Sequence, residues 1–148
     1  MSAVCWVAPR LGWPPNYPSP MYLPLSNPAR CLPLVAEYLA NLPAGYYTVK
    51  AEDLSAELAE SPVVLIDLRT DGEYAEGFIE GSLHIPFADF MTRISEVPTT
   101  GLVVLYDNPT HRSTMAMVML QLLGYTDIRV LAGGSGAWAS AGLPLVTE

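Results

Sequence analysis

Apolar and polar positions alternate in short blocks from residue 46 to the end of the chain. Two blocks, residues 63–66 and 102–105, are apolar at every position, which is typical of strands in a parallel sheet covered on both faces. The segments between the apolar blocks have the spacing of short helices. The pattern therefore predicts an α/β fold of three layers, with a central parallel sheet and helices on both faces.

The same pattern gives the bounds of the expected elements. We expect strands over residues 46–49, 63–67, 83–87, 102–106 and 128–131, with the first at a sheet edge. We expect helices over residues 51–60, 71–77, 87–94, 111–124 and 134–142. In the fourth helix, core packing accounts for Met115 and Met119. Ligands of such folds bind at the carboxyl ends of strands, so the loop over residues 107–112 is the first candidate site.

The N-terminal part of the chain has a different composition. Residues 1–33 hold eight of the 14 prolines together with several Trp and Tyr residues. So many prolines exclude a regular helix or a central strand, and the aromatic content is too high for a plain disordered tail. We expect an extension lying across the domain or across a neighbouring subunit, which would allow a homo-oligomer. A lead-in helix is expected within residues 34–45, before a domain over residues 46–148.

Composition and charge narrow the possible functions. A chain of 148 residues fits one domain, and its net charge of -8 with a single lysine, Lys50, argues against nucleic acid and anionic membranes as partners. No apolar run is long enough for a membrane helix and no signal-peptide pattern is present, so we expect a cytoplasmic protein. Cys5 and Cys31 form neither a disulfide framework nor a metal-ligand spacing, and we expect no metal and no cofactor.

The stretch "VVLYDNPTHRSTMAM" contains the candidate loop. Peptide N–H groups that point into a tight loop, with the positive end of a helix behind them, form an anion cradle. A cysteine at the first position of such a loop would gain acidity and could carry a sulfur atom as a persulfide. In this chain the first position is Asp107.

Three stretches in the expected order resemble the rhodanese-like domain family, from about residue 48 to residue 144. They are "LIDLRTDGEYAEGFIEGSLHIPF", "LYDNPTHRS" and "LAGGSGAWASAGLP". In that family the loop reads Cys, four residues, Arg, and Arg112 and Ser113 stand at matching positions. The resemblance implies a rhodanese-like fold of the single-domain bacterial type and, where the family's cysteine is present, sulfurtransferase activity.

The departures from the family pattern affect the expected function most. Asp107 stands where the family has its nucleophilic cysteine, Pro109 removes one loop N–H group, and Thr110 replaces the usual glycine. Phe78 stands where a histidine is common. Because a carboxylate cannot carry a persulfide, we expect no catalytic residue here and a binding or regulatory module.

Other enzymatic functions need groups that the loop lacks. A sulfurtransferase could still operate with a thiol from Cys5, from Cys31 or from a partner chain. Dual-specificity phosphatases of this fold have a loop one residue longer, and an aspartyl-phosphate mechanism at Asp107 would need a metal ion and further carboxylates.

The candidate ligand-binding residues are those of the loop. They are Asp107, Asn108, Pro109, Thr110, His111, Arg112 and Ser113. In one interpretation the Asp107 carboxylate accepts hydrogen bonds from loop N–H groups and pairs with Arg112 as a built-in anion. In the other, Asp107, His111 and Arg112 form a polar pocket that recognises a cationic or amide group of an unidentified protein or small molecule.

Several polar residues outside the loop have structural interpretations. Asp67 and Arg69 follow a buried strand and are expected to organise loops through hydrogen bonds in support of the site. Asp71, Glu73 and Glu76 are expected on a solvated helix face. His84 is expected to be a structural hydrogen-bond partner rather than a base, and Trp138 to anchor the last helix.

Overall fold

The computed structural model describes residues 36, 40, 42, 45 and 47–147. Contacts divide the chain into two units, Met1–Asn41 and Leu42–Glu148. The expected extension, its two cysteines and most of the lead-in helix lie outside the described residues. The division into an extension, a lead-in helix and a domain therefore stays a prediction.

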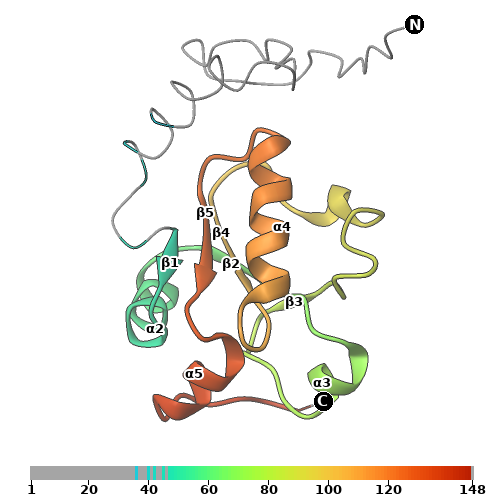
Figure 1. Cartoon of the computed structure of the whole chain (residues 1–148). Helices are drawn as coiled ribbons and strands as arrows, with labels where there is room; N and C mark the ends of the chain where they lie inside the picture. The colour runs from blue at the N-terminus through green and yellow to red at the C-terminus, as the bar shows by residue number, and fades with distance from the viewer. Residues whose placement is uncertain (1–35, 37–39, 41, 43–44, 46, 148) are drawn as a thin grey trace, which may run out of the picture. The chain divides into compact units, whose positions relative to one another are not determined.

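A parallel sheet forms the centre of the second unit (Figure 1). Its strands are β1 (Thr48–Val49), β2 (Val63–Asp67), β3 (Leu83–His84), β4 (Leu102–Tyr106) and β5 (Ile128–Leu131). Their order in the sheet is β1-β5-β4-β2-β3. The central strands β2 and β4 pair from Val63↔Leu102 to Asp67↔Tyr106. Asp67 and Tyr106 therefore lie together at the carboxyl edge of the sheet, where the candidate loop begins.

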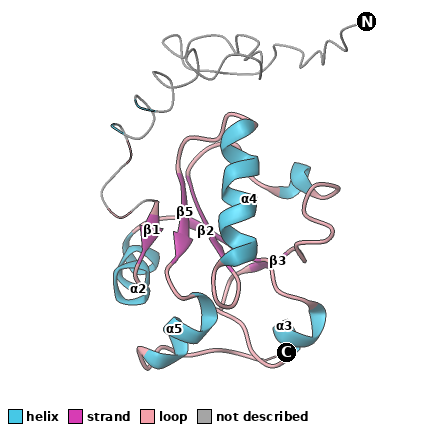
Figure 2. Ribbon diagram, in the orientation of Figure 1, coloured by secondary structure: helices cyan, strands magenta, loops and turns pink. Residues whose placement is uncertain are grey.

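Helices cover both faces of this sheet, as Figure 2 shows. Helix α4 (His111–Leu122) packs on one face, where Leu120 meets a cluster that includes Ile66 and Leu105. Helices α2 (Ala51–Glu60) and α5 (Gly134–Ser140) lie on the other face, where Leu54 and Trp138 pack with Val104. The presence of helices on both faces of the sheet confirms the predicted three-layer α/β fold. It also explains why the central strands are apolar, since both of their faces are buried.

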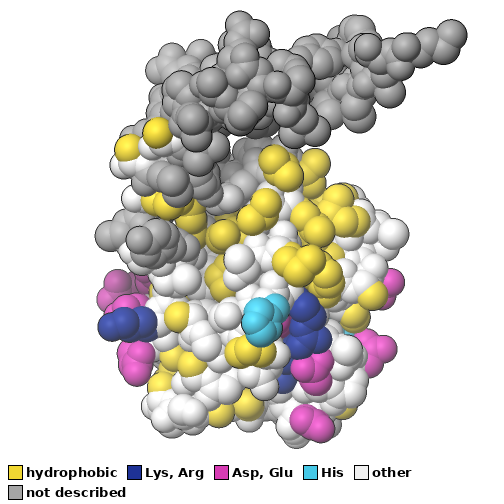
Figure 3. Space-filling view, in the orientation of Figure 1, with side chains coloured by type: hydrophobic (Ala, Val, Ile, Leu, Met, Phe, Trp, Pro, Cys, Tyr) yellow, Lys and Arg dark blue, Asp and Glu magenta, His cyan; other side chains and the backbone are white. Residues whose placement is uncertain are grey.

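The outer surface of α4 is more apolar than expected for a solvated helix. Met117 is buried, whereas Met115 is 52% exposed, so the prediction that packing accounts for Met115 was wrong. Ser113, Ala116 and Leu120 face the sheet, and this helical phase turns position 115 outward. The space-filling view shows the resulting apolar surface over α4 (Figure 3), and its exposed residues are Met115, Val118, Leu122 and Leu123.

The expected helix over residues 87–94 is absent. Residues 87–92 form successive turns, in which Asp89 N donates to Pro86 O at 2.8 Å and Phe90 N to Phe87 O at 3.3 Å. A short 3₁₀ helix, η1 (Ile94–Glu96), follows these turns. Phe90 is fully buried, so the segment is shaped by insertion of this ring into the core rather than by helical spacing.

Several other elements are shorter than expected, and β3 and α3 illustrate the reasons. β3 ends at His84, although Ile85 N and Phe87 N still donate to Asp67 O and Leu68 O at 2.9 and 3.1 Å. Because these two acceptors are successive residues, the spacing is no longer that of a regular parallel ladder. Helix α3 (Asp71–Ala75) ends before Gly77, whose φ of 141° is not helical and whose N–H donates back to Tyr74 O. The chain then pairs with its C-terminal segment, through reciprocal 2.8 Å hydrogen bonds between Phe78 and Val146.

Candidate functional site

Asp107 lies directly after β4 and caps the N-terminus of α4. Its Oδ2 accepts from the backbone N–H of Arg112 at 3.0 Å, and its Oδ1 accepts from the backbone N–H of Ser113 at 3.3 Å. The Ser113 hydroxyl donates to the same Oδ1 at 2.6 Å. Thr110, the residue at the N-cap position, makes no side-chain cap, so Asp107 satisfies these two N–H groups in its place.

The Asp107 side chain is 1% exposed and also pairs with Arg112, whose Nε lies 3.3 Å from Oδ2. A carboxylate at a helix N-terminus is stabilised by the helix dipole and by charge-assisted hydrogen bonds. In this geometry the Asp107 carboxylate lies inside the loop and is held by the N–H groups of Arg112 and Ser113. In the other interpretation Asp107 faces a ligand, but here its oxygens point into the loop, and His111 is exposed at the surface.

Arg112 connects the loop to α3 through a bidentate ion pair. Its Nη1 and Nη2 lie 2.8 Å from the two carboxylate oxygens of Glu73. Glu73 is held in turn by a capping box, in which Thr70 N and Thr70 Oγ1 donate to its Oε2 at 2.9 and 2.8 Å. Glu73 is therefore part of the site, although the sequence placed it on a solvated helix face.

The hydrogen bonds from Arg112 lower the pKa of Glu73 well below its usual range, with a smaller contribution from Thr70. The same pair raises the pKa of the Arg112 guanidinium. A depressed carboxyl pKa stabilises the fold at pH values above the pKa of the unfolded chain, and this contribution disappears as pH falls through the folded-state pKa.

Glu73→Gln should therefore lower the melting temperature at neutral pH, and the difference from the wild type should shrink below about pH 4.5. Thermal unfolding measured between pH 3 and pH 7 checks this expectation. Glu76→Gln, the same change at an exposed position just after α3, controls for the altered net charge. A difference that stays constant down to pH 3 would show that the ion pair does not contribute through Glu73 ionisation.

The glycine-rich segment at the start of α5 holds the loop from the other side. Ser135 N donates to Asp107 O at 2.9 Å. Gly134 has a φ of 59°, and a Cβ atom there would lie 2.0 Å from Asp107 O and 2.8 Å from Pro109 O. Only glycine permits this close backbone approach, so the segment "GGSG" acts as a support for the loop rather than as a dinucleotide site.

Asp67 and Arg69 form a buried network beside the loop. Arg69 donates from Nε and Nη2 to the Asp67 carboxylate at 2.6–3.0 Å, and its Nη2 also donates to Gly77 O at 2.7 Å. The Arg69 side chain is 6% exposed and the Asp67 side chain 0%. Burial alone would lower the pKa of Arg69, but the hydrogen bond and charge of Asp67, together with smaller contributions from Tyr106, raise this pKa overall. Asp67 and Arg69 thus join the end of β2 to the backbone after α3.

Tyr106 and His84 extend this network. The Arg69 guanidinium lies 5.7 Å from the centroid of the Tyr106 ring, and burial raises the pKa of the Tyr106 phenol. The Tyr106 hydroxyl donates to Ser82 Oγ and accepts from Ile79 N. His84 Nε2 lies 3.0 Å from Arg69 O, which is the structural role expected for this histidine.

The structure brings three of the seven predicted loop residues into one cluster. Asp107, Arg112 and Ser113 share one hydrogen-bonded cluster, whereas Asn108, Pro109 and His111 are exposed around it and Thr110 is half-buried. Sequence reasoning missed Glu73 and Gly134. The sequence signal for Glu73 was its capping-box spacing from Thr70, but nothing local indicated its pairing with Arg112, 39 residues away.

Candidate metal ligands are dispersed over the described part of the chain. Among these residues no group of three or more His, Cys, Asp or Glu side chains is placed to hold a metal ion. No helix in this part of the chain has the length and apolar character needed to cross a membrane.

Comparison with known proteins identifies the family. Residues 50–141 match the rhodanese-like domain model. A sulfurtransferase of Allochromatium vinosum is 39% identical over 99 residues, which cover 66% of this chain and 92% of that protein. A thiosulfate sulfurtransferase of Pseudomonas fluorescens is 31% identical over 84 residues, covering 55% of this chain and 74% of the relative.

Solved structures agree with this match. A rhodanese-related protein of Thermoplasma volcanium superposes with a TM-score of 0.64 at 25% identity, covering 70% of this chain and 100% of that structure. A rhodanese-like domain protein of Staphylococcus aureus gives a TM-score of 0.62 at 26% identity, covering 68% and 97%. The chain belongs to the rhodanese-like domain family.

Proposed function

We propose that this domain has no sulfurtransferase activity of its own and acts as a binding or regulatory module through the loop over residues 107–112. In this proposal Asp107 stands at the position of the family's nucleophilic cysteine. The observation that carries it is the Asp107 carboxylate, which is 1% exposed and accepts hydrogen bonds from Arg112 and Ser113. A group held in this way can neither accept a sulfur atom nor leave the anion cradle open.

The outer surface of the loop supplies the binding function. Asn108, Pro109 and His111 are exposed, and Arg112 is 25% exposed beside Glu73. Because Arg112 is already paired with two carboxylates, the loop does not present a free cation to an anionic ligand. The exposed amide, ring and imidazole groups suit a neutral polar or peptide partner.

Asp107→Cys tests the proposal in the standard reaction of thiosulfate with cyanide. In that reaction a thiolate breaks the S–S bond of thiosulfate and becomes a persulfide as sulfite leaves, and cyanide then removes the sulfur as thiocyanate. We expect no thiocyanate from the wild type and measurable turnover from Asp107→Cys, because the Arg112 and Ser113 N–H groups would then face a sulfur atom.

The control is Asp107→Ser, which fits the same place but cannot form a persulfide under these conditions. Activity in the wild type would contradict the proposal. If Asp107→Cys is inactive although it folds, Pro109 and Thr110 have also reshaped the loop, and restoring a glycine at position 110 in the Cys variant is the next test.

A second candidate function is an active sulfurtransferase that uses a thiol from elsewhere. It is favoured by the two relatives named above, both of which are called sulfurtransferases. The thiol would come from Cys5, from Cys31 or from a partner protein, and both cysteines lie outside the described residues. Wild-type activity that disappears in the double variant Cys5→Ser/Cys31→Ser would establish this function in place of the first.

A further inference from the structure

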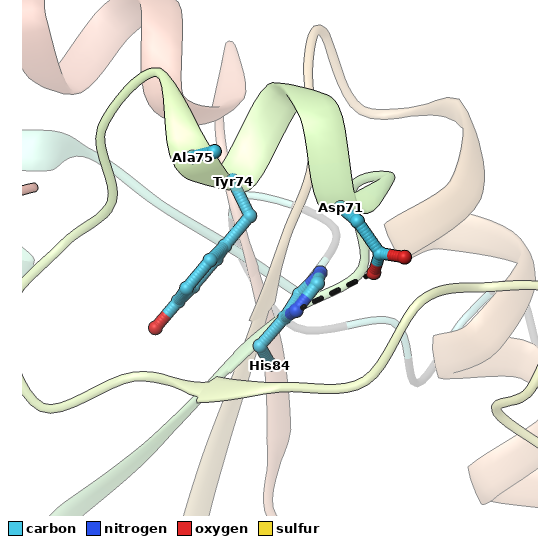
Figure 4. Close-up of a pocket in the computed structure, with 4 residues that line it drawn as sticks. All are labelled: Asp71, Tyr74, Ala75 and His84. Carbon is cyan, nitrogen blue, oxygen red and sulfur yellow. Dashed lines mark ion pairs between the residues drawn. The ribbon is translucent and has the colours of Figure 1, made fainter. Parts of the chain in front are cut away.

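An open pocket of about 380 Å³ lies between α3 and β3 and is lined by Asp71, Tyr74, Ala75 and His84 (Figure 4). None of these residues belongs to the loop over residues 107–112, so the pocket is separate from the proposed function. Figure 4 shows the Asp71 carboxylate and the His84 ring turned toward each other, with the Tyr74 ring on the other side of the imidazole.

The tautomer of His84 follows from its hydrogen bond to the backbone. Its Nε2 lies 3.0 Å from Arg69 O, and a carbonyl oxygen can only accept a hydrogen bond. The proton of the neutral ring is therefore assigned to Nε2. Nδ1, the nitrogen nearer to Asp71, is then an acceptor with a free lone pair.

The orientation of the imidazole is fixed by its surroundings. The His84 ring stacks on Tyr74 with centroids 4.1 Å apart and planes 12° apart, and Tyr74 stacks in turn on Phe78 at 4.2 Å. The carbonyl that holds Nε2 belongs to Arg69, whose side chain is anchored in the buried pair with Asp67. Rotation of the ring would break both the stack and the hydrogen bond, so Nδ1 stays the ring nitrogen that lies 4.0 Å from Asp71 Oδ1.

Nδ1 of His84 and Oδ1 of Asp71 are 4.0 Å apart, which is too far for a hydrogen bond between them. Two acceptors, one of them anionic, therefore face the same space. A nitrogen at about 2.9 Å from both would need N–H bonds roughly 90° apart, which is near the tetrahedral angle of an ammonium group. We propose that this pocket binds a primary ammonium group between Asp71 and His84.

The charges around the pocket favour a cation. On α3, Glu73 is neutralised by Arg112, while Asp71 is 93% exposed and has its carboxylate facing the pocket. From the segment after β3, Arg93 donates to His84 O at 3.1 Å and is itself paired with Glu96. With a net charge of -8, the chain also attracts cations at long range.

Nuclear magnetic resonance of the imidazole nitrogens tests the proposal directly, because the chain has two histidines, His84 and His111. Putrescine and Nα-acetyl-lysine N-methylamide are titrated separately into the full-length protein, at a pH where the His84 Nδ1 shift is that of an unprotonated nitrogen. His84→Phe assigns the signals. We expect a saturable shift of His84 Nδ1, no saturable shift of His111, and no response to 1-butanol, which matches the size of the amine without its charge.

Asp71→Asn should weaken the binding of either amine at least fivefold, whereas Asp53→Asn, the same change at an exposed position on α2, should alter it less than twofold. Binding of the lysine derivative without putrescine would assign the ammonium to a protein side chain, and the reverse would assign it to a free amine. The absence of a saturable His84 shift, an equal response of His111, or unchanged binding in Asp71→Asn would overturn the proposal.

Discussion

Arg69→Met should destabilise the domain by about 3–5 kcal/mol, since it leaves the carboxylate of Asp67 buried without its counter-ion. The Asp67 side chain is fully buried, and it would keep only the Arg69 backbone N–H as a hydrogen-bond donor among the present contacts. The variant would also lose the hydrogen bond from Nη2 to Gly77 O, which orients the chain after α3. Urea unfolding at neutral pH measures the loss as a lower midpoint with an unchanged slope.

Two further variants separate the buried pair from ordinary surface pairs. Arg129→Ala removes an ion pair with Glu57 in which both side chains are about a third or more exposed, and should cost no more than about 1 kcal/mol. The double variant Asp67→Leu/Arg69→Met should be more stable than Arg69→Met alone, because no uncompensated charge remains. If the loss of stability in the double variant equals the sum of the losses in Asp67→Leu and Arg69→Met, this account is contradicted.

The fold could be predicted from the sequence wherever burial is two-sided. β2 and β4 are apolar at nearly every position because both of their faces are covered, and few alternative arrangements produce that pattern. The prediction of a helix over residues 87–94 was wrong because the apolar spacing there suits a helix as well as a series of turns. The conformation of this segment depends instead on the Phe90 side chain, which packs in a core formed by residues distant in the sequence. The prediction for Met115 was wrong for a related reason. When a helix is apolar on several sides, its sequence does not show which side faces the sheet.

The candidate site could be predicted only as far as its local contacts. Asp107 and Arg112 belong to one loop and carry opposite charges, so their ion pair could be predicted from the sequence. Glu73 comes from another element, and its role depends on the parallel register that sets α3 beside the start of α4. The sequence shows a glycine at position 134 but not its role. That role depends on a close approach to the backbone of Asp107, which is distant in the sequence.

Gly134→Ala should disrupt the loop itself. The added Cβ would meet two carbonyl oxygens, those of Asp107 and Pro109, at 2.0 and 2.8 Å. Both are backbone atoms and cannot rotate away, so either the loop or the start of α5 must shift. A left-handed alanine costs roughly 1–2 kcal/mol and overpacking a further 1–3, which together predict a loss of about 2–5 kcal/mol.

Gly81→Ala is the matched control, because Gly81 has a φ of 80° but no atom within 4 Å of the position that a Cβ would take. It isolates the cost of the left-handed backbone, so the excess loss in Gly134→Ala measures the overlap with the loop. The amide signals of Arg112 and Ser113 should also move in Gly134→Ala and not in Gly81→Ala, since both N–H groups donate to Asp107. Equal losses in the two variants, with unmoved amide signals, would show that α5 does not position the loop.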